Sequence, residues 1–369
     1  MRVDRLVLHD FRNIRDASIE PHPRFNVIHG DNAQGKTNLL EAVYLLGTLR
    51  SFKSATNPEL IRWGSDEAAA RGVVVRREVT RDIRINIRAQ GRAVSVDGKR
   101  PRRLQDALGT LTVVLFAPED LEVSKGSPAA RRAFLDRAVF NVFPAYWDEL
   151  RAFETALKSR NALLRDLVGP PGDVLEVFDA QVAATGARVT DKRLRFLAGY
   201  MQHFGSVHGR LACGRHAAQL CYESDWRGSA AGIEDLEATL LARLGQDKRR
   251  DAARGSTSSG PHRDDLGIVL DGVTARSHAS QGQHRTLVLA LKIGEILHLE
   301  EVLGYSPVLL LDDVSSELDR HRNTELMSFL DGSGVQVFVS TTDLAHIRHE
   351  GGLVAWRMEG GQIVDEERR

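Results

Sequence analysis

The chain has few cysteines and no surplus of either charge. Its 369 residues include two cysteines, Cys213 and Cys221, which are eight apart and form no C-x-x-C pair. The sequence therefore suggests no zinc site and favours reduced thiols in a cytosolic protein. Fifty Lys and Arg residues offset fifty Asp and Glu residues, so any binding of nucleic acid must rest on a local basic patch.

Long apolar runs and repeats are also missing. No stretch approaches the roughly 18 apolar residues of a membrane span, and the N-terminal MRVDRLVLHDF has charges within its apolar stretch, unlike a secretory signal. There is no internal repeat, no low-complexity tract and no a/d heptad pattern that lasts three or four turns. We expect a cytoplasmic protein of two or three lobes, because 369 residues is long for one core.

The most specific motif is the sequence GDNAQGKT at Gly30–Thr37, which fits the phosphate-loop pattern G-x-x-x-x-G-K-[ST]. The apolar run Phe25–Ile28 before it predicts a buried strand, and the periodicity of Asn38–Leu46 after it predicts a helix. This order points backbone N–H groups and a helix N-terminus at phosphate oxygens. We therefore expect a nucleoside triphosphate to bind here.

Each residue type in the loop suits a phosphate. Lys36 would reach the β- and γ-phosphates, and the hydroxyl of Thr37 would hold Mg²⁺. The predicted nucleotide contacts of this segment are Gly30, Asp31, Asn32, Ala33, Gln34, Gly35, Lys36, Thr37 and Asn38.

A second motif is the apolar run Val308–Leu311, followed by Asp312 and Asp313. The run suits a central parallel strand that is buried on both faces. Carboxylates at its C-terminal end fall where open α/β sheets bind ligands. We therefore expect Asp312 to bind Mg²⁺ or its water, and Asp313 to polarise the attacking water. Without the phosphate loop, the same pattern would be typical of any strand that ends in a polar turn.

A third motif is the string SQGQ at Ser280–Gln283, 32 residues before Asp312. Ser280 is expected to cap the helix predicted over His284–Leu299, and Gly282 permits a close approach of the backbone. The string alone is weak and fits a simple helix start. Its place between the phosphate loop and the acidic strand resembles the order of motifs in ABC-type ATPases.

That resemblance implies how two copies of the chain would meet. In ABC-type ATPases the signature serine and its helix N-terminus bind the γ-phosphate that the other subunit holds, and a helix dipole suits an anion. Here the matching residues are Ser280, Gly282 and Gln283, and the D-loop of the family would be Ser315–Asp319. ATP would then join two heads into a homodimer.

Spacing separates the branches of this superfamily. Lys36 and Ser280 are 244 residues apart, much farther than in transporter ATPases, and Ser340–Asp343 stands where a transporter has its switch histidine. SMC-type ATPases fit the start Phe11–Ile14, in which the arginine, here Arg12, approaches the bound nucleotide. They insert a long coiled coil between the motifs, whereas the insert here is too short and lacks heptads.

The chain resembles the RecF family, the compact, armless relatives that act in recombinational gap repair. Most of the stretches that carry the resemblance fit a helix start, a solvated face or a turn when taken alone. Their joint occurrence in family order is what identifies the family. These stretches are Leu8–Asn13, Phe116–Leu121, Gly126–Pro128, Arg131–Asp136, Leu157–Asn161 and Gly260–Asp265.

The resemblance implies an ATP-dependent homodimer that binds double-stranded or gapped DNA. It implies RecR and RecO as partners, and RecA loading at gaps during DNA replication, DNA damage repair, recombination and the SOS response. Hydrolysis should be slow, because Asp313 is one methylene shorter than the glutamate that ABC ATPases often have there. The alternative is an ABC transporter-type ATPase subunit. A nuclease-linked ATPase and a DNA scaffold with a vestigial ATP site are weaker readings.

A basic segment is the best local candidate for contact with DNA. Arg71–Arg103 contains eleven Lys or Arg residues and three acidic ones. Alternate arginines of strands here would share a face and bind phosphates without reading sequence, although charged edge strands also occur simply to prevent aggregation. Lys248–Arg250 and the Lys192–Arg195 cluster are secondary candidates. The residues predicted to contact DNA are Arg84, Arg88, Arg102 and Arg103.

The sequence predicts an α/β protein of the ABC-type ATPase head class, with a mixed-sheet lobe, a mainly helical lobe and no coiled-coil arm. The first lobe would combine residues 1–115 with 305–369, and the second would span 116–304 and carry the signature. Asp97–Gly98 predicts a hairpin turn, and Gly169–Gly172 predicts a break between two long helices.

Overall fold

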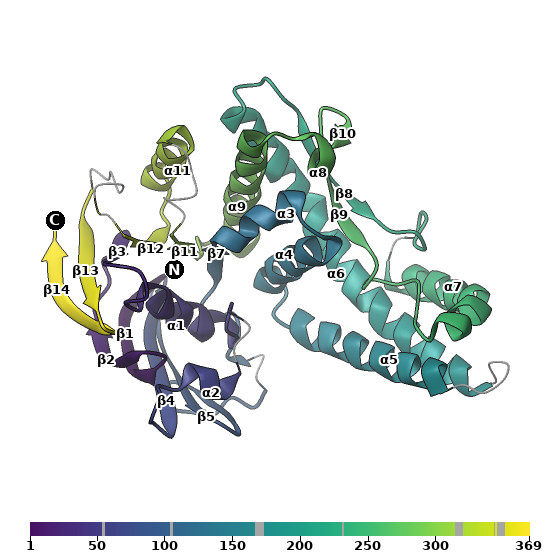
Figure 1. Cartoon of the computed structure of the whole chain (residues 1–369), viewed down its shortest axis with the longest axis horizontal. Helices are drawn as coiled ribbons and strands as arrows, with labels where there is room; N and C mark the ends of the chain where they lie inside the picture. Colours follow the sequence, from purple (N-terminus) through teal and green to yellow (C-terminus); the bar gives the residue numbers. More distant parts are fainter. Residues whose placement is uncertain are drawn as a thin grey trace. The chain divides into compact units, whose positions relative to one another are not determined.

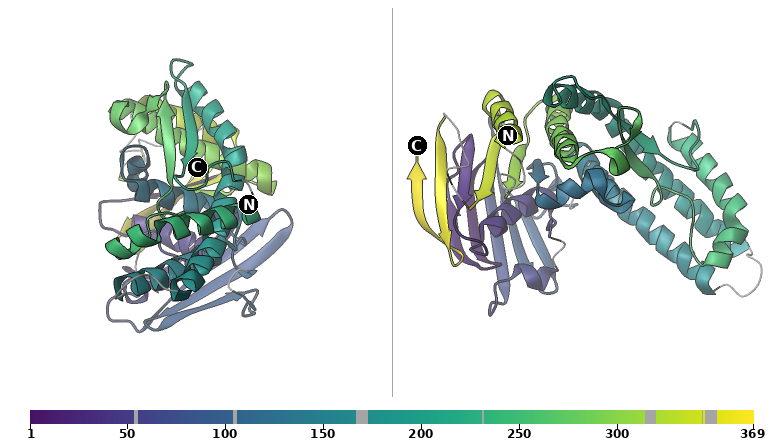
Figure 2. Two further views of the ribbon diagram at one scale, coloured as in Figure 1. Left: turned by 90° about the vertical axis from the view of Figure 1, so that its right-hand side faces the viewer. Right: turned by 45° about the horizontal axis from the view of Figure 1, so that its top comes forward.

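The computed structural model describes the chain except residues 54–55, 104–105, 167–172, 231, 314–319, 343 and 345–350. The chain divides into two compact units, one of Met1–Leu121 with Leu291–Arg369 and one of Glu122–Ala290. Sheets dominate the first unit and helices the second (Figures 1 and 2). Helix α9 (Gln281–Leu303) continues across the later border, so composition alone could not locate that border.

The larger sheet of the first unit has six strands in the order β14-β13-β3-β12-β11-β7. All pair in parallel except β14 at one edge. Their bounds are β3 Phe25–His29, β7 Val113–Phe116, β11 Val308–Asp312, β12 Gln336–Thr341, β13 Leu353–Glu359 and β14 Gln362–Arg368. The carboxyl ends of β3, β12 and β11 meet at one edge, because Thr341 pairs with His29 and Asp312 pairs with Ser340.

The predicted elements around the two nucleotide motifs are confirmed. Strand β11 is buried along its whole length, as a central parallel strand should be. Helix α1 (Lys36–Thr48) follows the phosphate loop directly and lies between the two sheets of the first unit (Figure 1). Its side chains pack against both sheets, which explains why nearly all of its residues are buried.

The second sheet of this unit is antiparallel, with the order β2-β1-β4-β5-β6. Its strands are β1 Arg2–Phe11, β2 Ile14–Ile19, β4 Glu67–Arg76, β5 Val79–Arg88 and β6 Gly91–Val96, and the short helix α2 is Asn57–Leu60. The predicted turn after β6 is present: Asp97 and Gly98 both have positive φ, and Lys99 N–H donates to Val96 at 3.0 Å. Lys99, after the turn, forms an isolated β-bridge with Val96 instead of starting a further strand.

The second unit combines helices with a three-stranded sheet of order β10-β9-β8. The described part of the chain has no long coiled-coil arm, and none of its helices is both long and apolar enough to cross a membrane. The predicted break at Gly169–Gly172 lies outside the described residues. The elements are α3 Glu122–Lys125, α4 Pro128–Val142, α5 Tyr146–Asp166, α6 Asp173–Leu211, β8 Ala218–Glu223, α7 Ile233–Arg254, β9 Asp265–Leu270, β10 Val273–Thr274 and α8 Ala275–His278.

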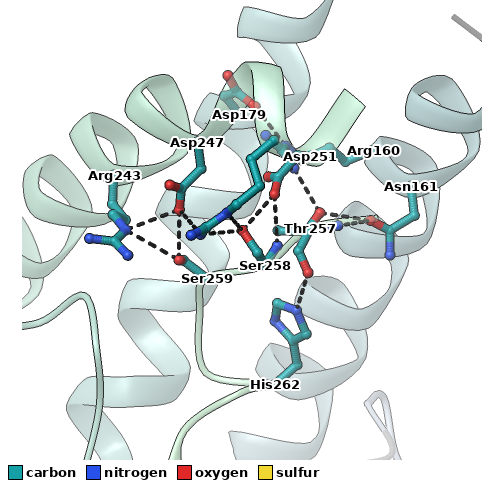
Figure 3. A network of polar contacts seen from close by, with 11 residues as sticks. Arg160, Asn161, Asp179, Arg243, Asp247, Asp251, Thr257, Ser258, Ser259 and His262 are labelled. Atoms are coloured by element: carbon teal, nitrogen blue, oxygen red, sulfur yellow. Dashed lines mark hydrogen bonds and ion pairs between the residues drawn. The ribbon is translucent and has the colours of Figure 1, made fainter. Parts of the chain in front are cut away.

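Buried arginines hold the helices of the second unit together. Arg160 of α5 is completely buried and donates to Asp179 of α6 and Asp251 of α7, each at 2.7 Å. Its guanidinium also donates to Thr257 at 2.8 Å, so the network reaches the segment that leads to β9 (Figure 3). Loss of one partner of such a buried pair leaves an uncompensated charge, which costs about 3–5 kcal/mol.

A second network joins two of the stretches that the sequence analysis singled out. Arg193 of α6 is buried and donates to Asp136 of α4 at 2.9 Å and to the carbonyl of Pro261 at 2.7 Å. Arg131 of α4 donates with two nitrogens to the carboxylate of Asp265 at the start of β9. The segments Arg131–Asp136 and Gly260–Asp265 are therefore parts of one core, although each looks unremarkable in the sequence.

The turn between β3 and α1 has an unusual backbone. Gly30 and Gly35 have φ values of 141° and 109°, which favour glycine strongly. A Cβ atom at Gly30 would lie 2.4 Å from the carbonyl oxygen of Met358, so the turn also needs glycine for space. Ala33 has a left-handed φ of 65°, which is strained for a residue with a side chain.

Replacing Ala33 by Gly should stabilise the protein. Relief of the left-handed strain is worth about 1–2 kcal/mol, and the added freedom of the unfolded chain takes back about 0.4–1 kcal/mol. We expect a net gain of about 0.5–1 kcal/mol in the free energy of unfolding, measured by chemical denaturation. The same substitution at Ala238, an exposed position inside α7, is the control and should cost about 1 kcal/mol. A loss at Ala33 equal to that at Ala238 would contradict the assignment of strain.

Candidate nucleotide-binding site

The acidic end of β11 lies directly beside the phosphate loop. The hydroxyl of Thr37 donates to Oδ1 of Asp312 at 2.8 Å, although the two residues are 275 apart in the chain. Ser340 at the end of β12 donates to the same oxygen at 2.7 Å and accepts from the backbone N–H of Asp313 at 2.9 Å. The sequence did not assign Ser340 to the site; a polar residue at the end of the neighbouring apolar strand is the signal that could have found it.

The charged groups of the site influence one another. Nζ of Lys36 donates to the carbonyl oxygens of Gly30 and Asp31, both at 2.7 Å. Burial lowers the pKa of Lys36, and the carboxylates of Asp313, Asp31 and Asp312 oppose that shift. Burial raises the pKa of Asp312, while hydrogen bonds from Ser340 and Thr37 act in the opposite direction. The lysine and both acids of the motifs are thus close enough to interact electrostatically.

Thr37 and Asp312 fit a magnesium ion. Mg²⁺ prefers oxygen ligands, and a hydroxyl oxygen and a carboxylate oxygen lie 2.8 Å apart here. A divalent cation would also favour the ionised form of Asp312, whose pKa burial otherwise raises. Thr37 and Asp312 therefore suit Mg²⁺, the metal that phosphate-loop proteins use.

Arg12 is fixed against the helix that follows the phosphate loop. It lies between β1 and β2 with a left-handed φ of 58°. Its Nε and Nη2 donate to the two carboxylate oxygens of the fully buried Glu41 at 2.9 and 2.7 Å, and Nη1 donates to the carbonyl of Glu59 at 2.9 Å. This bidentate pair orients Arg12 relative to α1. Its predicted approach to the nucleotide stays a prediction.

The C-terminal hairpin contacts the phosphate loop, which the sequence analysis missed. The turn between β13 and β14 contains Gly360 and Gly361, whose N–H groups donate to the side chain of Gln34 at 2.5 Å and to its carbonyl at 3.0 Å. A Cβ atom at Gly361 would lie 2.1 Å from the carbonyl oxygen of Asn13, so only glycine fits. Asn13 in turn accepts from Asn38 at 2.8 Å. No local pattern in the sequence links residues so far apart.

The signature motif lies in the second unit and begins α9 as predicted. The hydroxyl of Ser280 accepts from the N–H of Gln283 at 3.3 Å, and the side chain of Gln283 accepts from the N–H of Ser280 at 2.7 Å. This reciprocal pair is a capping box, so the predicted capping role of Ser280 is confirmed. Ser280 is exposed, whereas Gly282 and Gln283 are partly buried. The predicted D-loop, Ser315–Asp319, and Asp343 lie outside the described residues.

The predicted DNA-contact arginines differ in their surroundings. Arg84 and Arg88 lie on the exposed face of β5, as the alternation of the strand predicts. Arg84 donates to the neutral Asn86 at 3.1 Å, whereas Arg88 pairs with Glu67 at 2.8 Å. Acidic side chains therefore reduce the positive charge of this face. The other two candidates are exposed in the connection between β6 and β7, namely Arg102 and Arg103.

Comparison with known proteins agrees with this geometry. The family model for the RecF/RecN/SMC N terminal domain matches residues 2–363. The DNA replication and repair protein RecF of Myxococcus xanthus is 43% identical over 376 residues, which cover 99% of this chain and 97% of that protein. The protein of the same name from Geobacter sulfurreducens is 40% identical and covers 95% of each chain.

Solved structures with a similar fold include a member of the same family. The recombination mediator protein RecF-ATPrS of the RecFOR pathway has a TM-score of 0.91 at 31% identity, covering 99% of this chain and 98% of the other. The Smc head domain of Pyrococcus furiosus has a TM-score of 0.56 at 15% identity, a likeness of fold alone. The match of sequence over almost the whole chain and the likeness of fold show that the chain belongs to the RecF family of DNA replication and repair proteins.

Proposed function

We propose that the chain is an ATP-dependent recombination mediator that hydrolyses ATP slowly. The observation that carries the proposal is the 2.8 Å hydrogen bond between Thr37 and Asp312, which unites the phosphate loop and the acidic strand in one site. A solved structure described as RecF-ATP, which is 30% identical to this chain with a TM-score of 0.88, supports ATP as the nucleotide. The first unit would be the ATPase lobe, and the second would carry the signature motif.

The residues of the site have distinct roles in this proposal. Lys36 compensates the charge of the β- and γ-phosphates, and its present contacts to loop carbonyls would give way to phosphate oxygens. Thr37 and Asp312 hold Mg²⁺, which supplies charge stabilisation at the phosphates when bound. Asp313 accepts a hydrogen bond from the attacking water and orients it. The geometry of Asp313 is braced by the hydrogen bond from its N–H to Ser340.

Two copies of the chain would close around the nucleotide. The helix N-terminus at Ser280 offers a hydroxyl and backbone N–H groups to an anion. The capping box uses the Ser280 oxygen as an acceptor, so its hydroxyl proton remains to donate to a phosphate oxygen. We propose that the γ-phosphate bound by one subunit is contacted by Ser280 of the other.

DNA and two partner proteins complete the proposal. We propose binding of double-stranded or gapped DNA through the arginine-rich face of the first unit, where the exposed Arg84 donates to the neutral Asn86. The RecFOR pathway of the matched structures supports RecR and RecO as partners, and RecA indirectly, in the cytoplasm. An ABC transporter-type subunit is not favoured, because the chain belongs to the RecF family over almost its whole length.

Substitutions at Lys36 and Asp313 should separate ATP binding from ATP hydrolysis. Lys36→Met removes a charged donor to phosphate and should weaken ATP binding about 10- to 100-fold, the equivalent of about 1.5–3 kcal/mol. Asp313→Asn should keep ATP affinity within a few fold but lower hydrolysis about 10²- to 10⁴-fold, because only water activation is lost. Asp235→Asn, at an exposed position in α7, serves as the control for charge removal. Normal turnover by Asp313→Asn would refute its assignment.

The arginine-rich face predicts a salt-dependent change in DNA affinity. Reversing charge with Arg84→Glu and Arg88→Glu should weaken duplex binding and flatten its salt dependence by about one unit of slope per lost phosphate contact. Affinity is measured by fluorescence anisotropy over a series of salt concentrations. Arg151→Glu, on an exposed arginine of the second unit, controls for overall charge. An unchanged slope in the double variant would locate the DNA surface elsewhere.

Dimerisation through Ser280 is the central test of the proposed function. Wild type should form dimers in ATP but not in ADP or without nucleotide, because the γ-phosphate is the shared contact. Ser280→Arg should bind ATP as a monomer and fail to dimerise, since a bulky side chain blocks the approach of the phosphate. Sedimentation velocity in the three nucleotide conditions measures both effects. Equal dimerisation in ADP and ATP, or normal dimers of Ser280→Arg, would overturn the model.

A further inference from the structure

The first turn of the signature helix is connected to a histidine and an aspartate that no sequence motif includes. His216 lies just before β8, and Asp271 lies in the turn between β9 and β10. Nδ1 of His216 lies 2.6 Å from Oδ2 of Asp271, and Nε2 of His216 lies 3.3 Å from the side-chain nitrogen of Gln283. All these residues and Ser280 belong to the second unit.

The hydrogen-bond chain has one consistent direction. The backbone N–H of Ser280 can only donate, so the oxygen of the Gln283 side chain must face it, as the 2.7 Å contact requires. The amide nitrogen of Gln283 then faces His216 and donates to Nε2, which must be unprotonated. The remaining ring proton of a neutral His216 sits on Nδ1 and donates to Asp271.

Asp271 is itself anchored to the strand beside it. Its Oδ1 accepts from the N–H of Ala217 at 2.8 Å, and its own N–H donates to the carbonyl of Ala217 at 2.9 Å. Its φ of 50° and the φ of 82° at Gly272 are typical of a tight hairpin turn. The chain of bonds thus runs from a fixed turn, through His216 and Gln283, to the N–H of Ser280.

We propose that His216 and Asp271 are positioning residues for the signature serine. The inference rests on the proposed function, in which Ser280 contacts the phosphate held by another subunit. A capping glutamine on an exposed helix end can rotate away, and Ser280 would then lose the bond to its backbone N–H. By holding the amide of Gln283, His216 keeps the first turn of α9 ordered before the phosphate arrives, so less ordering is required on association.

The experiment measures ATP-driven dimerisation by sedimentation, and ATP binding to the monomer with a fluorescent ATP analogue. His216→Ala should weaken the dimer about tenfold and leave monomer binding within twofold. Asp271→Asn should weaken the dimer several fold, because an amide has one acceptor oxygen for two donors. His216→Gln should restore dimerisation, since its side-chain oxygen can accept from the amide nitrogen of Gln283.

A control variant and the behaviour of wild type distinguish failure of the positioning role from failure of the proposed function. His278→Ala removes a histidine that precedes Ser280 closely in the sequence but lies outside the chain of bonds, and this variant should dimerise normally. Hydrogen exchange should show faster exchange at the first turn of α9 in His216→Ala, with the rest of the unit unchanged. Failure of wild type to dimerise in ATP would overturn the proposed function. Wild-type dimers together with normal dimers of His216→Ala, or no rescue by His216→Gln, would overturn the positioning role alone.

Discussion

One carboxylate oxygen links the parts of the first unit on which the nucleotide site depends. Oδ1 of Asp312 accepts from Thr37 at 2.8 Å and from Ser340 at 2.7 Å, so it connects the helix after the phosphate loop with the ends of two parallel strands. Because the carboxyl ends of parallel strands meet at one edge, residues from three distant segments are brought together without any further loop structure. The C-terminal hairpin then supports the loop from its other side through Gln34.

In the second unit, buried ion pairs hold the helices together. Arg160 is buried between two aspartates, and Arg193 is buried against Asp136 and the carbonyl of Pro261, so each arginine connects three or four segments. Burying an unpaired charge is costly, and removing one partner of a buried ion pair strongly destabilises the fold. These pairs therefore favour one packing of the helices over others. Strand β9 begins at Asp265, which pairs with Arg131, and the turn after this strand carries Asp271. Contacts therefore continue from the buried core of the second unit to the start of the signature helix.

The sequence predicted the local elements of the site well, because each motif is a short-range pattern. The glycine-rich loop, the apolar strand before it, the helix after it and the capped start of α9 all formed where periodicity and residue type indicated. The arginine-rich strands were predicted to share an exposed face, and Arg84 and Arg88 do so. The composition could not show that Glu67 would pair with Arg88, since cross-strand register is set by the whole sheet.

By itself the sequence determined the family, the nucleotide motifs and the α/β class, because spacing and residue type along the chain are enough for these. Only the tertiary structure decided which distant residues meet: Ser340 with Asp312, Gly361 with Gln34, and His216 with Gln283. It also decided that α9 runs without interruption across a unit border, which no change in composition marks. The physical reason is that contacts between segments far apart in the chain arise from strand order and packing, and neither leaves a local trace in the sequence.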